Sequence, residues 1–414
     1  MKMGAEKRLE VLSPAGDREK LVMAVTYGAD AVYLAGPGYG MRAAAGRFGP
    51  EDMAWAVKTC HSRGVKVYVT VNTIPTDEQM DRLPAYLESL AENRADGLIV
   101  SDVGVLALAK RYAPGLAVHI STQAGVMNAV TARAFHDMGA SRVVLAREMD
   151  LEQIAALRAR TPGELELEAF VHGAMCVSFS GRCVLSNYLT GRDANQGQCA
   201  QPCRWKYHVV EEKRPGEYMQ ITEDGGTYLF NSRDMCMIDH VPELLAAGVT
   251  SLKIEGRTKS AYYAAAVTNA YRRAADAALA GLPLAPVWRE EVLAVSHRPY
   301  STGFYFGQPG QYTDDACYFS RYDVAAVVER CDGDGNAVLT QRNRFFPGDQ
   351  LELLLPGAEP LAFISGEIRD GEDRPIPAAS HPKMELHMKL PVCAPPNAIV
   401  RKRRTRAVPG HGIS

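Results

Sequence analysis

The 414-residue sequence lacks any long apolar run. No stretch approaches the roughly 18 uncharged apolar residues of a membrane-spanning helix, so none is expected to cross a membrane. The N-terminus, MKMGAEKRLEVLSPAG, carries charged residues where a secretory signal would need a continuous apolar region. We therefore expect a cytoplasmic protein.

Net charge is nearly absent as well. The 46 basic and 48 acidic residues leave a formal charge of −2, so the whole molecule is not expected to attract nucleic acid through its charge. One local exception is RKRRTR, Arg401–Arg406, with five cationic residues in six. We interpret residues 401–414 as a basic tail, either a solvated end or an arm that contacts phosphate.

The signature motifs of several enzyme classes are also missing. The sequence contains no G-x-S-x-G, no H-E-x-x-H, no Walker lysine loop and no radical-adenosylmethionine cysteine spacing. His172 and Cys176 are the one candidate Cys–His peptidase pair, but such pairs are normally assembled from distant segments. Proteolysis is therefore the less favoured activity.

The sequence does contain a repeated pattern over its first 257 residues. A short run rich in Val, Ile and Leu ends in a polar residue and is followed by a helix-like segment, which is typical of parallel strands buried on both faces. Gly and Asp recur just before the runs, where a helix ends and the chain turns. The eight runs are Leu9–Ser13, Ala31–Ala35, Val65–Asn72, Gly97–Ser101, Ala117–Thr122, Arg142–Glu148, Leu167–His172 and Ser251–Glu255.

Eight strand-plus-helix units predict an α/β fold, a TIM-like (β/α)8 barrel over residues 1–281. An open doubly wound sheet is the alternative, but no G-x-G-x-x-G motif follows the first run to support it. Over residues 318–400 the pattern changes to short β-like runs separated by Gly, Pro and Asp turns, which predicts a small all-β barrel domain. We interpret residues 282–317 as the connection.

In such a barrel the catalytic residues lie where the strands end, at the carboxyl-terminal mouth. Helix capping can explain the short polar side chains of Ser13, Ser101 and Asn72. Long charged side chains do not cap helices and are costly to bury unpaired, so they are functional candidates. The polar residues at the run ends are Ser13, Tyr33, Asn72, Ser101, Thr122, Gln123, Arg147, Glu148, His172, Glu255 and Arg257.

The last run, SLKIEGR, contains three alternating charged residues, Lys253, Glu255 and Arg257. Residues two apart in a strand point to the same side, so all three are expected to share the barrel interior or its upper rim. They either form an ion-pair network that plugs the barrel, with Arg147 or Glu148 as partners, or a substrate site in which Arg257 holds a carboxylate.

Five of the nine cysteines fall between the seventh and eighth runs, an interval of about eighty residues that is far longer than an ordinary loop. We expect this segment to lie over the barrel mouth. Clustered thiols in a cytosolic protein more often bind metal or carry out redox chemistry than form disulfides. The spacing of Cys176, Cys183, Cys199 and Cys203 fits an iron–sulfur cluster and a zinc site equally well, and buried unligated thiols are the third alternative.

Cys236 follows the four clustered cysteines and is an alternative to Cys203 as a fourth ligand. The remaining cysteines stand in helix-like or strand-like contexts and are interpreted as small core residues. They are Cys60, Cys317, Cys331 and Cys393.

Four long segments resemble the collagenase-like U32 peptidase family. They are LEVLSPAGD (Leu9–Asp17), YGADAVYLAG (Tyr27–Gly36), the block from EAFVHGAMC to CRWKY (Glu168–Tyr207) and SLKIEGRTKSAYY (Ser251–Tyr263). The resemblance covers most of residues 9–280 and extends through the β-rich end. The RDANQG and CRWKY segments are most similar to the family's branch of tRNA hydroxylation proteins.

This resemblance implies a tRNA-modifying hydroxylase that forms 5-hydroxyuridine at the wobble position, with a 4Fe-4S cluster and with prephenate as a co-substrate. Other branches hydroxylate ribosomal RNA or a ubiquinone precursor, and the family label leaves a collagenase-like peptidase as a further alternative. The resemblance assigns the cluster to residues 172–236, with the ligands Cys176, Cys183, Cys199 and Cys203, and Cys236 as the alternative.

Prephenate is a dicarboxylate, and guanidinium groups bind carboxylates bidentately, which favours arginines at the mouth as its ligands. Our substrate-binding candidates are Arg147, Arg257, Tyr33, Asn72 and Gln123, and our catalytic candidates are Glu255, Lys253 and His172. For RNA, the segments LSNYLTGRDANQGQ and CRWKY offer residue types that stack on unpaired bases and contact phosphate. Packing around the cluster is the alternative role for Trp205.

Overall fold

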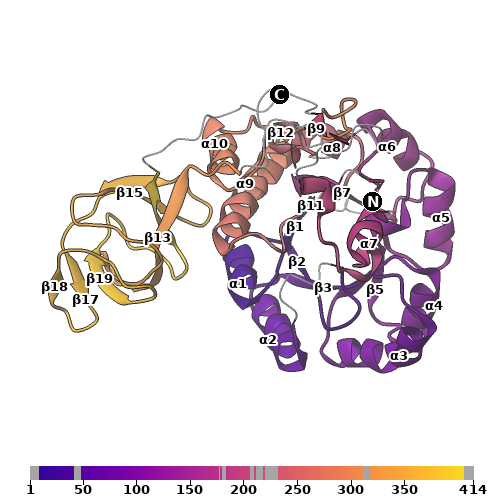
Figure 1. The fold of residues 1–414 in the computed structure, drawn as a ribbon, viewed down its shortest axis with the longest axis horizontal. Coiled ribbons are helices and arrows are strands. Elements are labelled where there is room, and N and C mark those ends of the chain that lie inside the picture. Colours follow the sequence, from indigo (N-terminus) through magenta and orange to yellow (C-terminus); the bar gives the residue numbers. More distant parts are fainter. Residues whose placement is uncertain are drawn as a thin grey trace, which may run out of the picture.

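The computed structural model describes residues 9–41, 48–176, 178–179, 183–205, 209–210, 218–219, 232–310 and 318–404. The chain forms a helix-ringed barrel and a smaller domain made of strands, joined on one side of the barrel (Figure 1). Each has its own hydrophobic core. Among the described residues, no helix has the length and apolar character needed to cross a membrane.

The larger domain is a closed barrel of eight parallel strands, as the sequence predicts. Neighbouring strands pair in chain order, and the last strand pairs with both the seventh and the first, which closes the ring. The strands are β1 (Glu10–Pro14), β2 (Ala31–Leu34), β3 (Lys66–Val71), β4 (Gly97–Val100), β5 (Ala117–Ile120), β6 (Arg142–Val144), β7 (Glu166–Ala174) and β11 (Ser251–Ile254).

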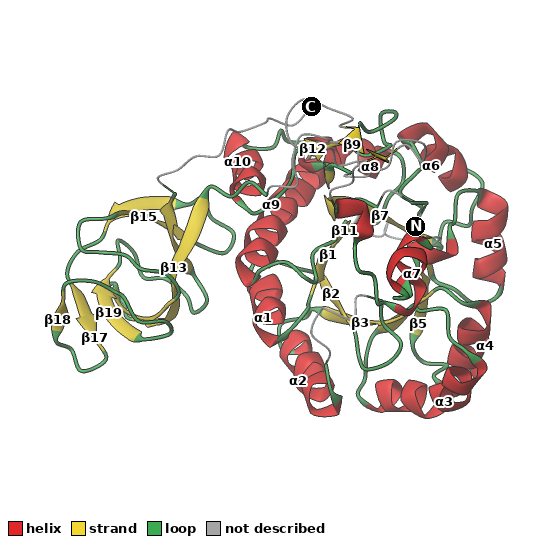
Figure 2. Ribbon diagram, viewed as in Figure 1, coloured by secondary structure: helices red, strands yellow, loops and turns green. Residues whose placement is uncertain are grey.

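Helices surround this barrel and cover the outward face of its strands (Figure 2). The strands are buried almost throughout, because their outer side chains pack on the helices and their inner side chains fill the barrel. The helices are α1 (Arg18–Thr26), α2 (Pro50–His61), α3 (Asp77–Glu92), α4 (Val103–Tyr112), α5 (Ala129–Asp137), α6 (Leu151–Arg158) and α9 (Ala261–Ala280).

Most of these helices begin at a polar capping side chain that lies outside the strands. Asp17, Asp102 and Asp150 cap α1, α4 and α6 by accepting hydrogen bonds from backbone N–H groups of the first turn. The suggestion that Ser13 and Ser101 are caps is therefore wrong. Ser13 bonds to Thr268 Oγ1 at 2.6 Å on α9, and the Ser101 hydroxyl donates to backbone carbonyls after β3.

The long segment between β7 and β11 lies over the carboxyl-terminal mouth of the barrel, as expected, with α7 (Leu185–Thr190) in front of the opening in Figure 1. Its strand β10 pairs antiparallel with the end of β7. Its other elements are η2 (Ala194–Gln196), η3 (Pro202–Arg204), β8 (Val209–Val210), β9 (Tyr218–Met219), β10 (Asp234–Cys236), η4 (Ile238–His240) and α8 (Val241–Ala246).

The connection after α9 is more ordered than a linker. It contains α10 (Pro286–Ala294) and β12 (Tyr300–Ser301), and β12 pairs with β10 at the edge of the barrel sheet. The smaller domain is one antiparallel sheet in the order β16-β15-β20-β13-β14-β19-β17-β18, and no pairing among the described residues joins its two ends. Its strands are β13 (Tyr322–Cys331), β14 (Asn336–Gln341), β15 (Gln350–Leu354), β16 (Leu361–Ile364), β17 (Ile368–Asp370), β18 (Pro375–Ile376), β19 (Glu385–Lys389) and β20 (Ile399–Arg403).

The basic run does not begin a tail at residue 401. Ile399–Arg403 form β20, a central strand of the smaller domain. Arg401 is buried between the domains, where its guanidinium group bonds to Glu291 of α10 at 2.6 and 2.7 Å and to Glu352. Lys402 and Arg404 also pair with carboxylates, so these three cations stabilise the fold. Residues 405–414 lie outside the described part of the chain.

Candidate active site at the barrel mouth

A cavity of about 150 Å³ opens at the carboxyl ends of the barrel strands. Residues on seven barrel strands and the loops that follow them form one wall, and the long segment after β7 forms the other. Polar and apolar side chains are mixed on these walls, which is typical of a small-molecule site. The strand-end residues that line it include Tyr33, Asn72, Thr122, Gln123, Arg147, Glu148, Lys253, Glu255 and Arg257.

The structure thus brings together all five predicted substrate-binding residues and two of the three predicted catalytic residues. Lys253, Glu255 and Arg257 share one cavity, as their alternation predicts. Asn72 lines the cavity and donates to Ser121 Oγ at 3.4 Å, so capping is not its role. Ser13, Ser101 and His172 are not among the lining residues.

Two glycines fix the segment that carries Glu255 and Arg257. Gly173, with φ of +112°, lies so close to the Glu255 carbonyl that a Cβ atom there would be 2.3 Å from the oxygen. A Cβ atom on Gly16 would lie 2.1 Å from the Arg257 carbonyl oxygen. Only glycine fits at these two positions. The loop after β1 and the end of strand β7 can therefore pack directly against the backbone of residues 255–257 at the mouth.

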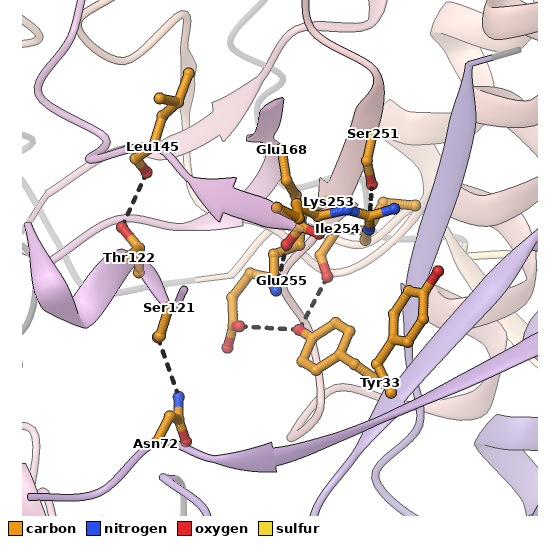
Figure 3. A network of polar contacts seen from close by, with 12 residues as sticks. Tyr33, Asn72, Ser121, Thr122, Leu145, Glu168, Ser251, Lys253, Ile254 and Glu255 are labelled. Atoms are coloured by element: carbon orange, nitrogen blue, oxygen red, sulfur yellow. Dashed lines mark hydrogen bonds and ion pairs between the residues drawn. The ribbon is translucent and has the colours of Figure 1, made fainter. Parts of the chain in front are cut away.

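Tyr33 contacts Glu255 in the barrel interior. Its hydroxyl lies 3.0 Å from the Ile254 carbonyl oxygen and 3.1 Å from Glu255 Oε2 (Figure 3). On the other side of the cavity, Thr122 donates to the Leu145 carbonyl at 3.0 Å, which holds the loop after β5 beside the loop after β6. These bonds orient the cavity wall.

Two buried guanidinium groups face the same cavity. Arg147 lies 3.8 Å above the centre of the Phe170 ring and donates to the Ala174 carbonyl at 3.1 Å. Arg257 is 3% exposed and donates to the Met41 carbonyl and to Thr70 Oγ1. Cations that are buried at a cavity wall and held by backbone carbonyls are well placed to bind an anion.

Below the cavity, the barrel interior holds a buried ion-pair network. Arg142 Nη1 lies 2.6 Å from Glu10 and 2.9 Å from Glu168, and Lys253 Nζ lies 2.5 Å from Glu168 Oε1. Tyr68 adds a hydrogen bond of 2.8 Å to Glu10. The carboxylates of Glu10 and Glu168, with the more exposed Glu166 also paired to Arg142 at 2.6 Å, offset much of the cost of removing the two cations from water.

The plug that the sequence suggests is therefore present, with Glu168 rather than Arg147 or Glu148 as the ion-pair partner of Lys253. Arg142 completes the network. Burial lowers the pKa of Lys253, and the charge of Arg142 lowers it further, whereas Glu168 and Glu255 oppose the shift. Lys253 belongs to both the network and the cavity wall.

Four cysteines line the cavity from the other side: Cys176, Cys183, Cys199 and Cys203. Burial raises the pKa of the Cys203 thiol, and the charges of the other three raise it further against the opposing effect of Arg204. The four cysteines face one cavity, and the donor set matches the four thiolates of an iron–sulfur cluster. Within the described residues, no three His, Cys, Asp or Glu side chains are grouped so as to hold a single metal ion.

Cys236 is separated from this group. It is 1% exposed on β10, opposite His172, and lies 4.0 Å from the Tyr271 hydroxyl without lining the cavity. Burial raises its pKa to about 12, so it stays protonated. Cys60 is in the core, as predicted, but Cys331 is only partly buried and Cys393 is exposed, so the core interpretation is wrong for these two. Cys317 lies outside the described residues.

His172 is a structural residue in this arrangement. Its ring is 1% exposed and bonds to the hydroxyls of Tyr300 at 3.1 Å and Tyr271 at 3.4 Å. Burial lowers its pKa to about 3, so the ring is neutral near pH 7. Neither a catalytic role at the cavity nor a peptidase pair with Cys176 agrees with this position.

Sequence reasoning missed the buried network around Lys253. Arg142 begins one apolar run and Glu168 is the second residue of another, whereas we assigned function only to the polar residues at the ends of the runs. Glu166 and Glu168 alternate in the same way as Lys253 and Glu255, and that period of two was the available signal that a carboxylate faces the interior.

The fold and the cavity define a (β/α)8-barrel protein with a cysteine-lined site at its mouth and an all-β domain beside it. Residues 16–315 match peptidase family U32, and residues 320–401 match the peptidase family U32 C-terminal domain. The chain belongs to peptidase family U32.

Relatives that carry three different names are similar to this chain in sequence. The tRNA hydroxylation protein P1 of Bacillus subtilis is 36% identical over 403 residues, 96% of this chain and 95% of that protein. The 23S rRNA 5-hydroxycytidine C2501 synthase of Escherichia coli is 38% identical over 270 residues, 65% of this chain and 40% of that protein. The collagenase of Porphyromonas gingivalis is 33% identical over 312 residues, 72% of this chain and 74% of that protein.

Proposed function

We propose that this protein is an RNA hydroxylase that forms 5-hydroxyuridine at the wobble position of tRNA, with a 4Fe-4S cluster and with prephenate as co-substrate. The observation that carries the proposal is one cavity with two different walls. Four cysteines line one wall and two buried arginines line the other. The relative named a tRNA hydroxylation protein matches almost the whole chain, including both domains.

In this proposal the cluster is held by Cys176, Cys183, Cys199 and Cys203, and when bound it supplies a redox centre beside the substrate. The backbone N–H of Gln201 donates to Cys199 Sγ at 3.3 Å, and such hydrogen bonds to sulfur tune a thiolate ligand. Cys236 is outside the ligand set because it lies on β10, paired beside β7, does not line the cavity and keeps its proton.

The arginines bind the carboxylates of prephenate. Arg147 and Arg257 approach from the ends of β6 and β11, and each is held by a backbone carbonyl, so their guanidinium groups keep their direction when the cavity is filled. Asn72 and Gln123 add polar contacts from the strands between them. This wall positions the co-substrate and excludes water from it.

Glu255 and Lys253 are the groups that hold or move a proton. Glu255 Oε2 accepts from Tyr33, which leaves its carboxylate directed along the cavity wall (Figure 3). Lys253 is held by Glu168 below it, so its ammonium group is fixed at the bottom of the cavity. A substrate hydroxyl between the two side chains would be oriented by both.

The test is mass spectrometry of nucleosides from tRNA and ribosomal RNA of a deletion strain that has no paralogue. We expect 5-hydroxyuridine to disappear from tRNA and to return with the wild-type gene but not with Glu255→Gln. Unchanged tRNA together with a lost hydroxylated cytidine in ribosomal RNA would reassign the substrate. Full complementation by a folded, iron-loaded Glu255→Gln protein would show that this carboxylate takes no part.

A further inference from the structure

Exposed apolar side chains concentrate on the segment that covers the cavity. Sixteen large apolar residues are exposed among those described, and five of them lie between residues 179 and 205. Monomeric proteins rarely leave such groups together on the surface without a partner. The five are Phe179, Val184, Tyr188, Leu189 and Trp205.

Neighbouring elements carry these side chains, so they form one surface. The helix α7 carries Tyr188 and packs beside η3, which Trp205 follows, and the Ala200 N–H donates to Ser186 Oγ at 2.9 Å between them. Phe179 lies over Gly125 and also lines the cavity, so the surface continues into the site. Tyr188 is 86% exposed, the highest value among the large apolar residues described.

Cations lie beside the aromatic rings of this surface. Arg204 follows Cys203 and donates to the Tyr318 hydroxyl at 2.7 Å, and Lys259 Nζ lies 4.1 Å from the centre of the same ring. Tyr318 is itself exposed. Tyrosine and tryptophan rings with arginine and lysine around them are typical of surfaces that bind single-stranded nucleic acid, because bases stack on the rings and phosphates pair with the cations.

We propose that Tyr188 and Trp205 stack the bases that flank the target nucleotide of a single-stranded RNA loop while that nucleotide enters the cavity. This inference rests on the proposed function. A base reaches a buried cavity only after it leaves its own stack, and the bases beside it then need new stacking partners. Aromatic rings suit either partner, but the lysine beside them favours RNA, because the contact surface for a protein would be depleted in lysine.

The experiment measures binding of a fluorescein-labelled RNA hairpin with a uridine-containing loop, and of the same strand in a full duplex, by fluorescence anisotropy at fixed salt. We expect the wild-type protein to prefer the hairpin and Tyr188→Ala to weaken that binding by about tenfold, the loss expected for one stacked base. Tyr188→Trp keeps an aromatic ring and should retain the affinity. Phe346→Ala removes a ring that is 44% exposed on the smaller domain and serves as the control.

Each failure has a different meaning. If the wild-type protein binds the hairpin and Tyr188→Ala binds it equally well, the stacking surface is wrong and the RNA hydroxylase proposal stands. If the wild-type protein binds neither RNA, both proposals fail. An equal loss with Phe346→Ala would place the RNA along the smaller domain and would overturn the assignment to α7.

Discussion

The two ends of the barrel interior contain similar charged side chains in opposite circumstances. At the lower end, Arg142 pairs with both Glu10 and Glu168, and Arg142 and Glu168 are almost fully buried. At the mouth, Arg147, Arg257 and Glu255 line an open cavity and bond to backbone carbonyls and a tyrosine hydroxyl. Buried ion pairs that face no cavity hold the fold together, whereas charged side chains that line a cavity can also contact a ligand there.

The largest expected effect is the loss of iron and sulfide from the cavity at the mouth. Cys203→Ser should lose the iron and sulfide of the protein purified without oxygen, because a serine hydroxyl is a poor substitute for a thiolate ligand. Cys236→Ser, the matched control, should keep most of the iron and sulfide, since this thiol lies on β10 beside β7 and does not line the cavity. Iron and sulfide analysis checks the pair. Loss of iron from both variants, or only from Cys236→Ser, would return Cys236 to the ligand set.

The next-largest expected effect is a loss of stability at the lower end of the barrel interior. Glu168→Gln leaves Lys253 and Arg142 without a shared carboxylate, and breaking a buried pair in this way costs about 3–5 kcal/mol of unfolding free energy. The control Glu164→Gln, exposed and four residues away, should change it by less than about 0.5 kcal/mol. Urea unfolding measures both. Equal stabilities for the two variants would show that the network does not hold the barrel.

Arg257→Lys tests whether the mouth binds a carboxylate. Lysine keeps the charge but loses the bidentate fork, so we expect a melting temperature within a few degrees of wild type and roughly a hundredfold lower prephenate-dependent hydroxylation. Arg82→Lys, on the exposed face of α3, is the control. A protein that unfolds, or one that hydroxylates normally, would contradict the carboxylate role and move Arg257 to the structural group.

The smallest effect is on pH dependence. Burial alone raises the pKa of Glu10, but Arg142, Tyr68 and Ser251 lower it more, so its folded-state pKa is below the ordinary value of 4.5. Its contribution to stability is therefore complete above the unfolded-state pKa and is lost as the pH falls through the folded-state value.

Glu10→Gln should accordingly flatten the acid side of the stability curve, whereas the exposed Glu19→Gln should leave it unchanged. Urea unfolding between about pH 7 and pH 3 checks this, since the ordinary carboxylate pKa lies within that range. An acid branch of unchanged slope in Glu10→Gln would remove Glu10 from the network.

Much of the candidate site follows from one sequence rule, that catalytic groups of a barrel lie where its strands end. That rule brings Tyr33, Arg147 and Glu255 to one cavity. The rule fails for His172. Strand β7 continues to Ala174 and pairs with β10, so the histidine lies opposite Cys236 and does not line the cavity. The length of a strand beyond the barrel depends on a partner from elsewhere in the chain, which local apolar pattern does not report.

The sequence by itself determined the barrel, its eight strands and the all-β domain, because apolar periodicity and turn residues are local properties. It also brought five cysteines into one long interval, but only the structure separated Cys236 from the four that line the cavity. Only the tertiary structure decided how the charges are used. It gave Lys253 the partner Glu168, and it buried Arg401 between the domains where the sequence predicted a free basic tail. Partners of a buried charge come from residues far apart in the chain, so packing and not composition assigns them.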